Sequence, residues 1–294
     1  MVKERITDKG LYKKLMKKVK IRIPAKLNLT LDVTGREKGY HNIDSLFLSV
    51  NVFDEIIVTE RKDEAVRLSF CGVSAEIAPE NSNAYRAAEA FVKKFGTCGA
   101  DISIKRNIPT GGGLGGSSAD AAGVLAGLAR LYNVNGELDE IAEDVGSDVS
   151  FMLRGGFARV RGRGTQIDPL VLGRRFYFLI LVAESSGSTA QCFKRFDEIG
   201  ASRSPCTPSA LAALEKNDAA EFRSLLKNDL FAAASELIPE IRENADALSL
   251  FGTTVMTGSG SAVFSIFDKK KERDRVYRRL KHVYGQRLIK AESL

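Results

Sequence analysis

The stretch from Pro109 to Ala122 constrains the fold more than any other part of this 294-residue chain. It reads Pro-Thr-Gly-Gly-Gly-Leu-Gly-Gly-Ser-Ser-Ala-Asp-Ala-Ala, so five glycines in six positions let the backbone take positive φ angles and approach a ligand closely. Beyond Ser118, apolar residues recur at helical spacing, at Val124, Leu125, Leu128, Leu131 and Tyr132. The pattern predicts a glycine loop that runs into a helix, whose free N–H groups and positive dipole end would suit a phosphate group.

The loop differs from the two commonest phosphate-binding motifs. It has neither the Gly-Lys-Ser/Thr of a Walker A motif nor the spaced G-x-G-x-x-G of dinucleotide-binding folds. A flexible hairpin that binds nothing is the alternative for any glycine-rich stretch. Ser117 and Ser118 add hydroxyl groups suited to phosphate oxygens or to a bound Mg²⁺, which favours the binding interpretation.

The remaining pattern predicts an α+β protein with two domains. In the first domain, alternating apolar residues indicate strands at 19–23, 45–52, 54–59, 66–70 and 101–105, with a helix at 83–95. A buried strand at 176–183 opens the second, followed by helices at 209–214, 219–231 and 238–250, strands at 253–257 and 262–267, and a helix at 271–282. We expect a basic extension at 1–18, a first domain at 19–172 and a second at 173–294.

Composition excludes several functional classes. The longest apolar run, Phe176 to Ala183, is much shorter than the roughly 20 residues of a membrane-spanning helix, and we expect a cytoplasmic protein with no membrane partner. Four scattered cysteines form no CxxC pair, and two histidines cannot supply a multi-histidine metal centre. The net charge of +7 suits polyanionic small substrates or nucleic acid. Its excess lies near the two ends with few interleaved aromatics, so we expect no nucleic-acid partner.

Five shorter motifs accompany the loop along the chain. Lys26 and Asn28 stand two residues apart in Pro-Ala-Lys-Leu-Asn, on one side of an extended segment. The others are Gly39-Tyr40-His41, Gly146-Ser147-Asp148-Val149, Asn228-Asp229-Leu230 and Gly258-Ser259-Gly260. Each alone has an ordinary structural explanation, such as a surface lysine, a turn aromatic or a helix cap.

Together and in this order, the motifs resemble those of the 4-diphosphocytidyl-2-C-methyl-D-erythritol kinases of the GHMP superfamily, from about Val19 to Phe267. The resemblance implies an N-terminal domain like ribosomal protein S5, a ferredoxin-like C-terminal domain and an active site in the cleft between them. It also implies transfer of the γ-phosphoryl group of ATP, with Mg²⁺, to the 2-hydroxyl of a cytidine-diphosphate-linked polyol of the non-mevalonate isoprenoid pathway. The protein would be a monomer or a homodimer. Another GHMP kinase, acting on mevalonate, homoserine or a sugar, is the alternative.

The resemblance also implies roles for particular residues. Lys26 and Asp148 match the catalytic pair, with Asp148 as the base and Lys26 as its charge partner. The ATP phosphates would lie against Pro109, Gly111, Gly112, Gly113, Leu114, Gly115, Gly116, Ser117 and Ser118, of which Ser118 is the candidate Mg²⁺ ligand. The acceptor would contact Asn28, Tyr40, His41, Asp148, Thr189, Phe193, Gly258, Ser259 and Gly260. Among these, Tyr40 and Phe193 match the rings that stack on the cytosine, and His41 matches the residue that hydrogen-bonds its edge.

The chain departs from the family pattern at four positions. Ser117 and Ala119 stand where the family usually has glycine and serine, so the resemblance leaves open which hydroxyl meets Mg²⁺. Ser150 replaces a proline after Asp-Val, and Lys38 replaces an aspartate before Gly-Tyr-His. None of these changes removes a proposed catalytic group.

Overall fold

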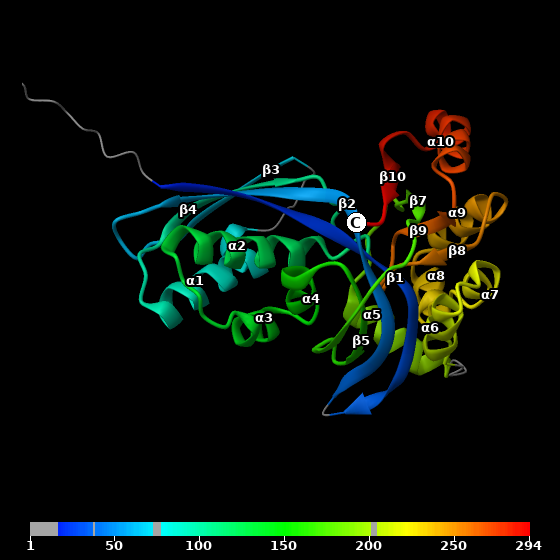
Figure 1. Ribbon diagram of the computed structural model, residues 1–294, viewed down its shortest axis with the longest axis horizontal. Coiled ribbons are helices and arrows are strands. Elements are labelled where there is room, and N and C mark those ends of the chain that lie inside the picture. The colour runs from blue at the N-terminus through cyan, green and yellow to red at the C-terminus, as the bar shows by residue number, and fades with distance from the viewer. Residues whose placement is uncertain (1–16, 38, 73–77, 201–204) are drawn as a thin grey trace, which may run out of the picture.

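The computed structural model describes residues 17–37, 39–72, 78–200 and 205–294, which form two α+β halves (Figure 1). The first half contains a six-stranded sheet in the order β3-β4-β2-β5-β6, with β1 paired to β2. Its strands are β1 (Lys18–Glu37), β2 (Tyr40–Glu60), β3 (Arg67–Gly72), β4 (Ala100–Arg106), β5 (Phe157–Gly162) and β6 (Gln166–Leu170). Only β3 and β4 pair in parallel among these described strands.

Helices cover one face of this sheet (Figure 1). They are α1 (Asn83–Phe95), α2 (Gly116–Tyr132), α3 (Asp139–Val145) and α4 (Val149–Arg154), preceded by the short 3-10 helix η1 (Pro79–Asn81). The second helix is the one that the sequence predicted to follow the glycine loop. Its buried residues include Val124, Leu125 and Leu128, so the predicted apolar stripe packs into the core.

The second half contains a four-stranded sheet in the order β10-β7-β9-β8. Its strands are β7 (Tyr177–Leu181), β8 (Thr254–Met256), β9 (Val263–Phe267) and β10 (Leu288–Glu292). The helices of this half are α5 (Thr189–Ile199), α6 (Thr207–Glu215), α7 (Ala219–Ser224), α8 (Phe231–Leu237), α9 (Glu240–Ser249) and α10 (Lys270–Tyr284), with η2 (Gly285–Arg287) before the last strand. The predicted α+β class is confirmed. The chain changes sheet between Leu170 and Tyr177, and the expected domain limits at 172 and 173 remain a prediction.

The strand β1 is long enough to take part in both halves. Leu27 and Leu29 are fully buried in the larger hydrophobic cluster, whereas Leu31 and Val33 pack in a second cluster with Leu179 of β7. Polar residues alternate with these apolar ones because successive side chains of a strand point to opposite faces. The polar side chains near the middle of β1 are therefore buried where the two cores meet.

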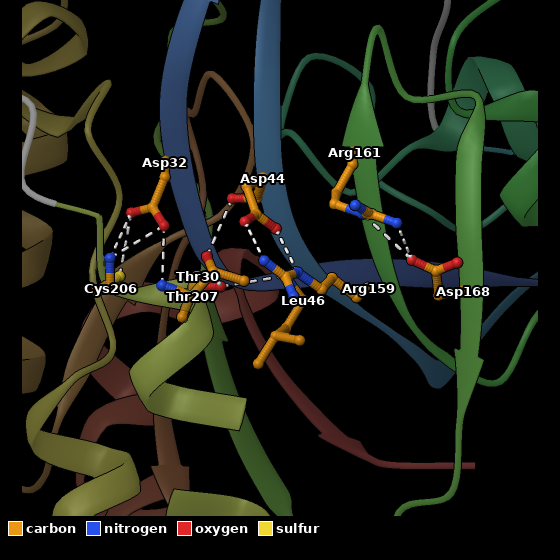
Figure 2. A network of polar contacts seen from close by, with 9 residues as sticks. All are labelled: Thr30, Asp32, Asp44, Leu46, Arg159, Arg161, Asp168, Cys206 and Thr207. Atoms are coloured by element: carbon orange, nitrogen blue, oxygen red, sulfur yellow. Dashed lines mark hydrogen bonds and ion pairs between the residues drawn. The ribbon is translucent and has the colours of Figure 1, made fainter. Parts of the chain in front are cut away.

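Polar contacts fasten α6 and β5 to the β1–β2 ribbon, as Figure 2 shows. Asp32 accepts the N–H of Thr207 at 2.8 Å, which satisfies a donor at the start of α6. The Thr207 hydroxyl donates to Thr30 at 2.7 Å, and Asp44 pairs with Arg159 of β5 at 2.6 Å. Since Asp32 and Asp44 are both buried, these contacts fix the ribbon against elements on either side.

Several expected elements were wrong in extent. The strands expected at 45–52 and 54–59 are the single strand β2. The helix expected at 219–231 is divided into α7 and α8, because the intervening segment pairs with β1. There the N–H of Leu31 donates to Lys227, and the N–H of Asp229 donates to Leu31, both at 2.9 Å. The sequence did not predict α3, α4, α5, β5, β6 or β10. Most of the expected extension at 1–18 lies outside the described residues, and β1 begins at Lys18.

No helix among the described residues is long and apolar enough to cross a membrane. Lys38, one of the departures from the family pattern, lies outside the described residues. Ser150 is buried in the first turn of α4, and Ala119 is buried in the first turn of α2.

Candidate active site

A cavity of about 860 Å³ lies where the β1–β2 ribbon, the glycine loop, α5 and the turn at 258–260 meet. Residues far apart in the sequence line it together. Of the predicted site residues, the lining includes Lys26, Asn28, Tyr40, His41, Gly111, Gly113, Gly115, Gly116, Ser117, Ser118, Asp148, Thr189, Phe193, Gly258, Ser259 and Gly260. Pro109, Gly112 and Leu114 do not belong to the lining. The structure therefore brings the motifs at both ends of the chain to one place.

At the centre of the cavity, a buried lysine faces a carboxylate. Lys26 Nζ lies 3.3 Å from Asp148 Oδ2, and Lys26 is only 3% exposed. It also donates to Asn28 Oδ1 at 2.5 Å and lies 4.9 Å from the centre of the Phe47 ring. Asp148 precedes α4 but makes no capping hydrogen bond with its side chain. The carboxylate thus remains available to a ligand, while Lys26 has a fixed position.

Asn28 joins the two halves at this point. Its Oδ1 atom accepts the N–H of Gly258 at 2.9 Å and the hydroxyl of Thr257 at 3.2 Å, and its Nδ2 atom donates to Ser45 at 3.0 Å. Because the same oxygen also accepts from Lys26, the amide holds the lysine and the turn in one arrangement. Asn28 lines the cavity, but the oxygen that a substrate could use already has protein donors.

The glycine loop is positioned by its own carbonyl groups. The Leu114 carbonyl accepts from the Lys26 N–H at 3.0 Å, and the Gly112 carbonyl accepts from Ala262 at 3.1 Å, which explains why these two residues turn away from the cavity. Gly113 and Gly115 have φ angles of 72° and 77°. A Cβ atom at Gly113 would lie 2.1 Å from the Thr257 carbonyl oxygen, so a side chain does not fit there.

The first turn of α2 presents backbone donors to the cavity. Gly116, Ser117 and Ser118 line it, and the residue before the helix, Gly115, has no side chain to cap the turn. N–H groups at a helix start that lack a cap form a ready site for an anion. Ser117 and Ser118 also bring hydroxyl groups to this part of the lining.

A pair of buried carboxyl groups supports the two ends of the loop. Asp54 accepts the N–H groups of Asn107 and Ile108 at 2.6 and 2.8 Å, just before the loop. Asp120, one turn into α2, accepts from Arg106 at 2.7 Å. Burial raises the pKa of Asp120 to about 7, because it outweighs the opposing effect of the Arg106 guanidinium; the Asp54 charge raises it further. Burial also raises the pKa of Asp54. Because Asp54 and Asp120 share the single cation Arg106, one of the two carboxyl groups tends to keep its proton.

The other end of the cavity is aromatic. The rings of His41 and Phe193 are stacked, with centroids 4.6 Å apart and planes 20° apart. His41 Nε2 lies 2.8 Å from Asp197 Oδ1, and Arg36 pairs with the same carboxylate at 3.3 Å. One face of Phe193 is thus covered by His41. The aromatic end is therefore not a simple slot between the rings of Tyr40 and Phe193, because the His41 imidazole covers one face of the Phe193 ring.

A turn between β5 and β6 connects the aromatic end with the ion pair. The Arg163 guanidinium lies 3.8 Å from the centre of the Tyr40 ring, which is 56% exposed. A Cβ atom at the next residue, Gly164, would lie 3.1 Å from the carbonyl oxygen of Ser147, so the turn packs against the residue beside Asp148. Within the described ranges, no carboxylate forms an ion pair with Arg163, and its charge is free for a ligand.

The sequence interpretation missed Arg163, Asp197 and Ser147, which all line the cavity. For Arg163 a signal was present, since Arg-Gly-Arg-Gly is a basic, glycine-rich turn. Asp197 carried no signal, because a carboxylate on an amphipathic helix is usually solvated. Elsewhere in the cavity lining, the hydroxyl groups of Thr189 and Ser259 are 2.9 Å apart and link α5 to the turn at 258–260.

Comparison with known proteins identifies the class. Residues 82–156 match the GHMP kinases N terminal domain, and residues 210–286 match the GHMP kinases C terminal domain. The structure also superposes on a homoserine kinase from Cytophaga hutchinsonii with a TM-score of 0.74, over 100% of this chain and 97% of that chain. Their sequences are 17% identical, so this likeness concerns the fold alone. The protein is a GHMP kinase, and the predicted fold is confirmed.

Closer relatives define the family. The chain is 34% identical over 289 residues to a 4-diphosphocytidyl-2-C-methyl-D-erythritol kinase of Shouchella clausii, covering 94% of this chain and 96% of the relative. A crystal structure of 4-(cytidine 5'-diphospho)-2C-methyl-D-erythritol kinase matches with a TM-score of 0.77 and 29% identity, over 94% of this chain and 99% of that one. The chain belongs to the 4-diphosphocytidyl-2-C-methyl-D-erythritol kinase family, as the motifs predicted.

Proposed function

We propose that this kinase transfers the γ-phosphoryl group of ATP to the 2-hydroxyl of 4-diphosphocytidyl-2-C-methyl-D-erythritol, in the non-mevalonate isoprenoid pathway. The observation that carries the proposal is that the glycine loop, the Lys26–Asp148 pair and the His41–Phe193 stack line one cavity. Its volume of about 860 Å³ suits a nucleotide-sized ligand. Mevalonate and homoserine carry no base that would use the aromatic end.

Asp148 is the proposed base. In-line phosphoryl transfer needs little covalent help from a protein, so positioning and charge stabilisation dominate. The 2-hydroxyl oxygen of the substrate attacks the γ-phosphorus, and the bond between this phosphorus and ADP breaks. The Asp148 carboxylate accepts the proton that the hydroxyl loses. Lys26, fixed by Asn28, offsets the negative charge that spreads over the transferring group.

The glycine loop and the start of α2 are the proposed phosphate site. Positive φ angles at Gly113 and Gly115 leave the backbone exposed, and uncapped N–H groups follow in Gly116–Ser118. The ATP-binding role of Pro109, Gly112 and Leu114 is proposed as indirect, since their backbone shapes the loop.

Magnesium would be held mainly by the phosphates. Among the described residues, no group of three or more His, Cys, Asp or Glu side chains could hold a metal ion. Mg²⁺ bound to a nucleotide needs only one or two protein oxygens, and the Ser118 hydroxyl in the cavity fits that requirement, as does its neighbour Ser117. When bound, the ion neutralises part of the phosphate charge.

Arg163 is the proposed partner of the acceptor's diphosphate. The acceptor carries its base at one end and its reacting hydroxyl at the other, so the diphosphate lies between them. Arg163 contacts Tyr40 at the base end, and its turn packs beside Asp148 at the reacting end. A guanidinium with no described ion-pair partner supplies the charge that a diphosphate requires.

The test is ADP release by the purified protein with Mg-ATP and three acceptors: the cytidine compound, mevalonate and homoserine. We expect turnover with the cytidine compound alone. Turnover with mevalonate or homoserine instead would refute the assigned acceptor while leaving the kinase class intact. Asp139→Asn, at an exposed ion pair with Arg154 outside the cavity lining, is the matched control for Asp148→Asn in the same assay.

A further inference from the structure

The carboxylate of Asp197 does not contact the ion pair or the phosphate loop, yet it faces the cavity. It lies on α5, in the second half of the molecule, and accepts a hydrogen bond from His41 of β2 at 2.8 Å. The His41 side chain is 9% exposed and that of Asp197 is 35% exposed. A helix of one half therefore fixes an imidazole of the other at the aromatic end.

This hydrogen bond determines which nitrogen of His41 carries hydrogen. An ionised carboxylate only accepts hydrogen bonds, so the Nε2 atom must be the donor. In a neutral imidazole the second nitrogen is then an acceptor. The Nδ1 atom makes no hydrogen bond with any described residue, and the stack on Phe193 holds the ring plane. The cavity thus presents an acceptor at a fixed position.

We propose that Asp197 is a positioning residue that makes this cavity select cytosine over uracil, through the tautomer of His41. The inference rests on the proposed function. Cytosine carries an exocyclic amino group, a donor that Nδ1 can accept, where uracil carries a carbonyl oxygen. With uracil, two acceptors oppose each other, and a buried group left unpaired costs about 1–3 kcal/mol. The expected preference for the cytidine compound is therefore about 10- to 100-fold in kcat/KM.

The experiment compares the cytidine acceptor with its uridine analogue, at about pH 8, where imidazole groups are ordinarily neutral. In the wild-type protein we expect the preference given above. Asp197→Ala leaves His41 free to adopt either neutral tautomer. The ratio of kcat/KM for the cytidine acceptor to that for the uridine analogue should then lie within about threefold of one, with the KM for ATP unchanged. Asp197→Glu keeps an acceptor and should retain the ratio. Asp168→Asn is the matched control, because Asp168 is an exposed partner of Arg161 outside the cavity lining.

Binding of CDP and UDP, measured by calorimetry for each variant, gives the same ratio without turnover. Alanine suits an exposed helical position, so α5 should remain folded in Asp197→Ala. An unchanged ratio in Asp197→Ala, for both turnover and binding, would overturn the inference while leaving the proposed function intact. A wild-type protein that does not turn over the cytidine compound would overturn both.

Discussion

Replacement of Asp148 by asparagine tests the centre of the proposed mechanism. Asparagine has the shape of aspartate but neither the charge nor the basicity. Because the Asp148 side chain makes no capping bond to α4, the substitution leaves the start of that helix unchanged. A general base contributes about 10²- to 10⁴-fold to the rate, so we expect kcat to fall by that factor, or about 3–5 kcal/mol in activation free energy.

The effect on stability should be much smaller than the effect on rate. At 3.3 Å and an effective dielectric constant of about 20, the attraction between Lys26 and Asp148 is about 5 kcal/mol before desolvation. The variant no longer desolvates a carboxylate at position 148, which offsets much of this loss, and Lys26 keeps its bond to Asn28. We therefore expect a loss of about 1–2 kcal/mol in the free energy of unfolding.

Two measurements separate these effects. Rapid-quench single turnover with labelled ATP gives the rate of transfer, and thermal unfolding gives the stability. The KM for ATP should stay within about threefold of wild type, since the proposed phosphate site lies on the loop and α2. A variant that transfers the phosphoryl group within threefold of the wild-type rate would refute the assignment of Asp148 as the base.

Three further predictions concern the aromatic end, the diphosphate and the loop support. Tyr40→Ala should raise the KM for the cytidine acceptor about 10-fold through lost stacking, and steady-state kinetics that instead show weaker ATP binding would contradict this. Arg163→Met should raise the same KM about 10- to 100-fold with kcat nearly unchanged, because it removes a charged donor; an unchanged KM would exclude Arg163 from diphosphate binding. Asp120, whose pKa burial raises to about 7, holds a proton in the folded state that the unfolded chain has lost above about pH 4. Folding stability from this group is thus present below pH 4 and decreases up to about pH 7. In urea titrations, Asp120→Asn should show a smaller decrease over that range than wild type, and equal slopes would contradict the raised pKa.

The local motifs were predictable because their chemistry lies in adjacent residues. Five glycines before an apolar helical stripe predict a loop that enters a helix, and α2 begins at Gly116 as that pattern requires. Lys26 and Asn28 were also visible as an alternating pair on an extended segment. Their burial was not, since a lysine on a strand is ordinarily exposed.

Tertiary contacts decided the features that the sequence did not predict. The segment after α7 was expected to continue a helix, but hydrogen bonds to Leu31 on both sides of Asn228 hold it beside β1. Asp197 becomes part of the site only because α5 lies against the start of β2, at His41. Neither relation has a signature in residue spacing, because each depends on how two distant segments pack.

Residues that line the cavity also form the junction of the two halves. Asn28 binds Gly258 across the junction, and Gly113 approaches Thr257 so closely that only glycine fits. Leu27 belongs to one hydrophobic cluster and Leu31 to the other, and Asn28, which holds the buried Lys26, lies between them in the sequence. A buried charge requires partners, and one partner of Lys26, Asn28, is itself held by Gly258 of the second half. Docking of the halves therefore fixes the amide that positions Lys26 beside Asp148, which couples the fold to the chemistry.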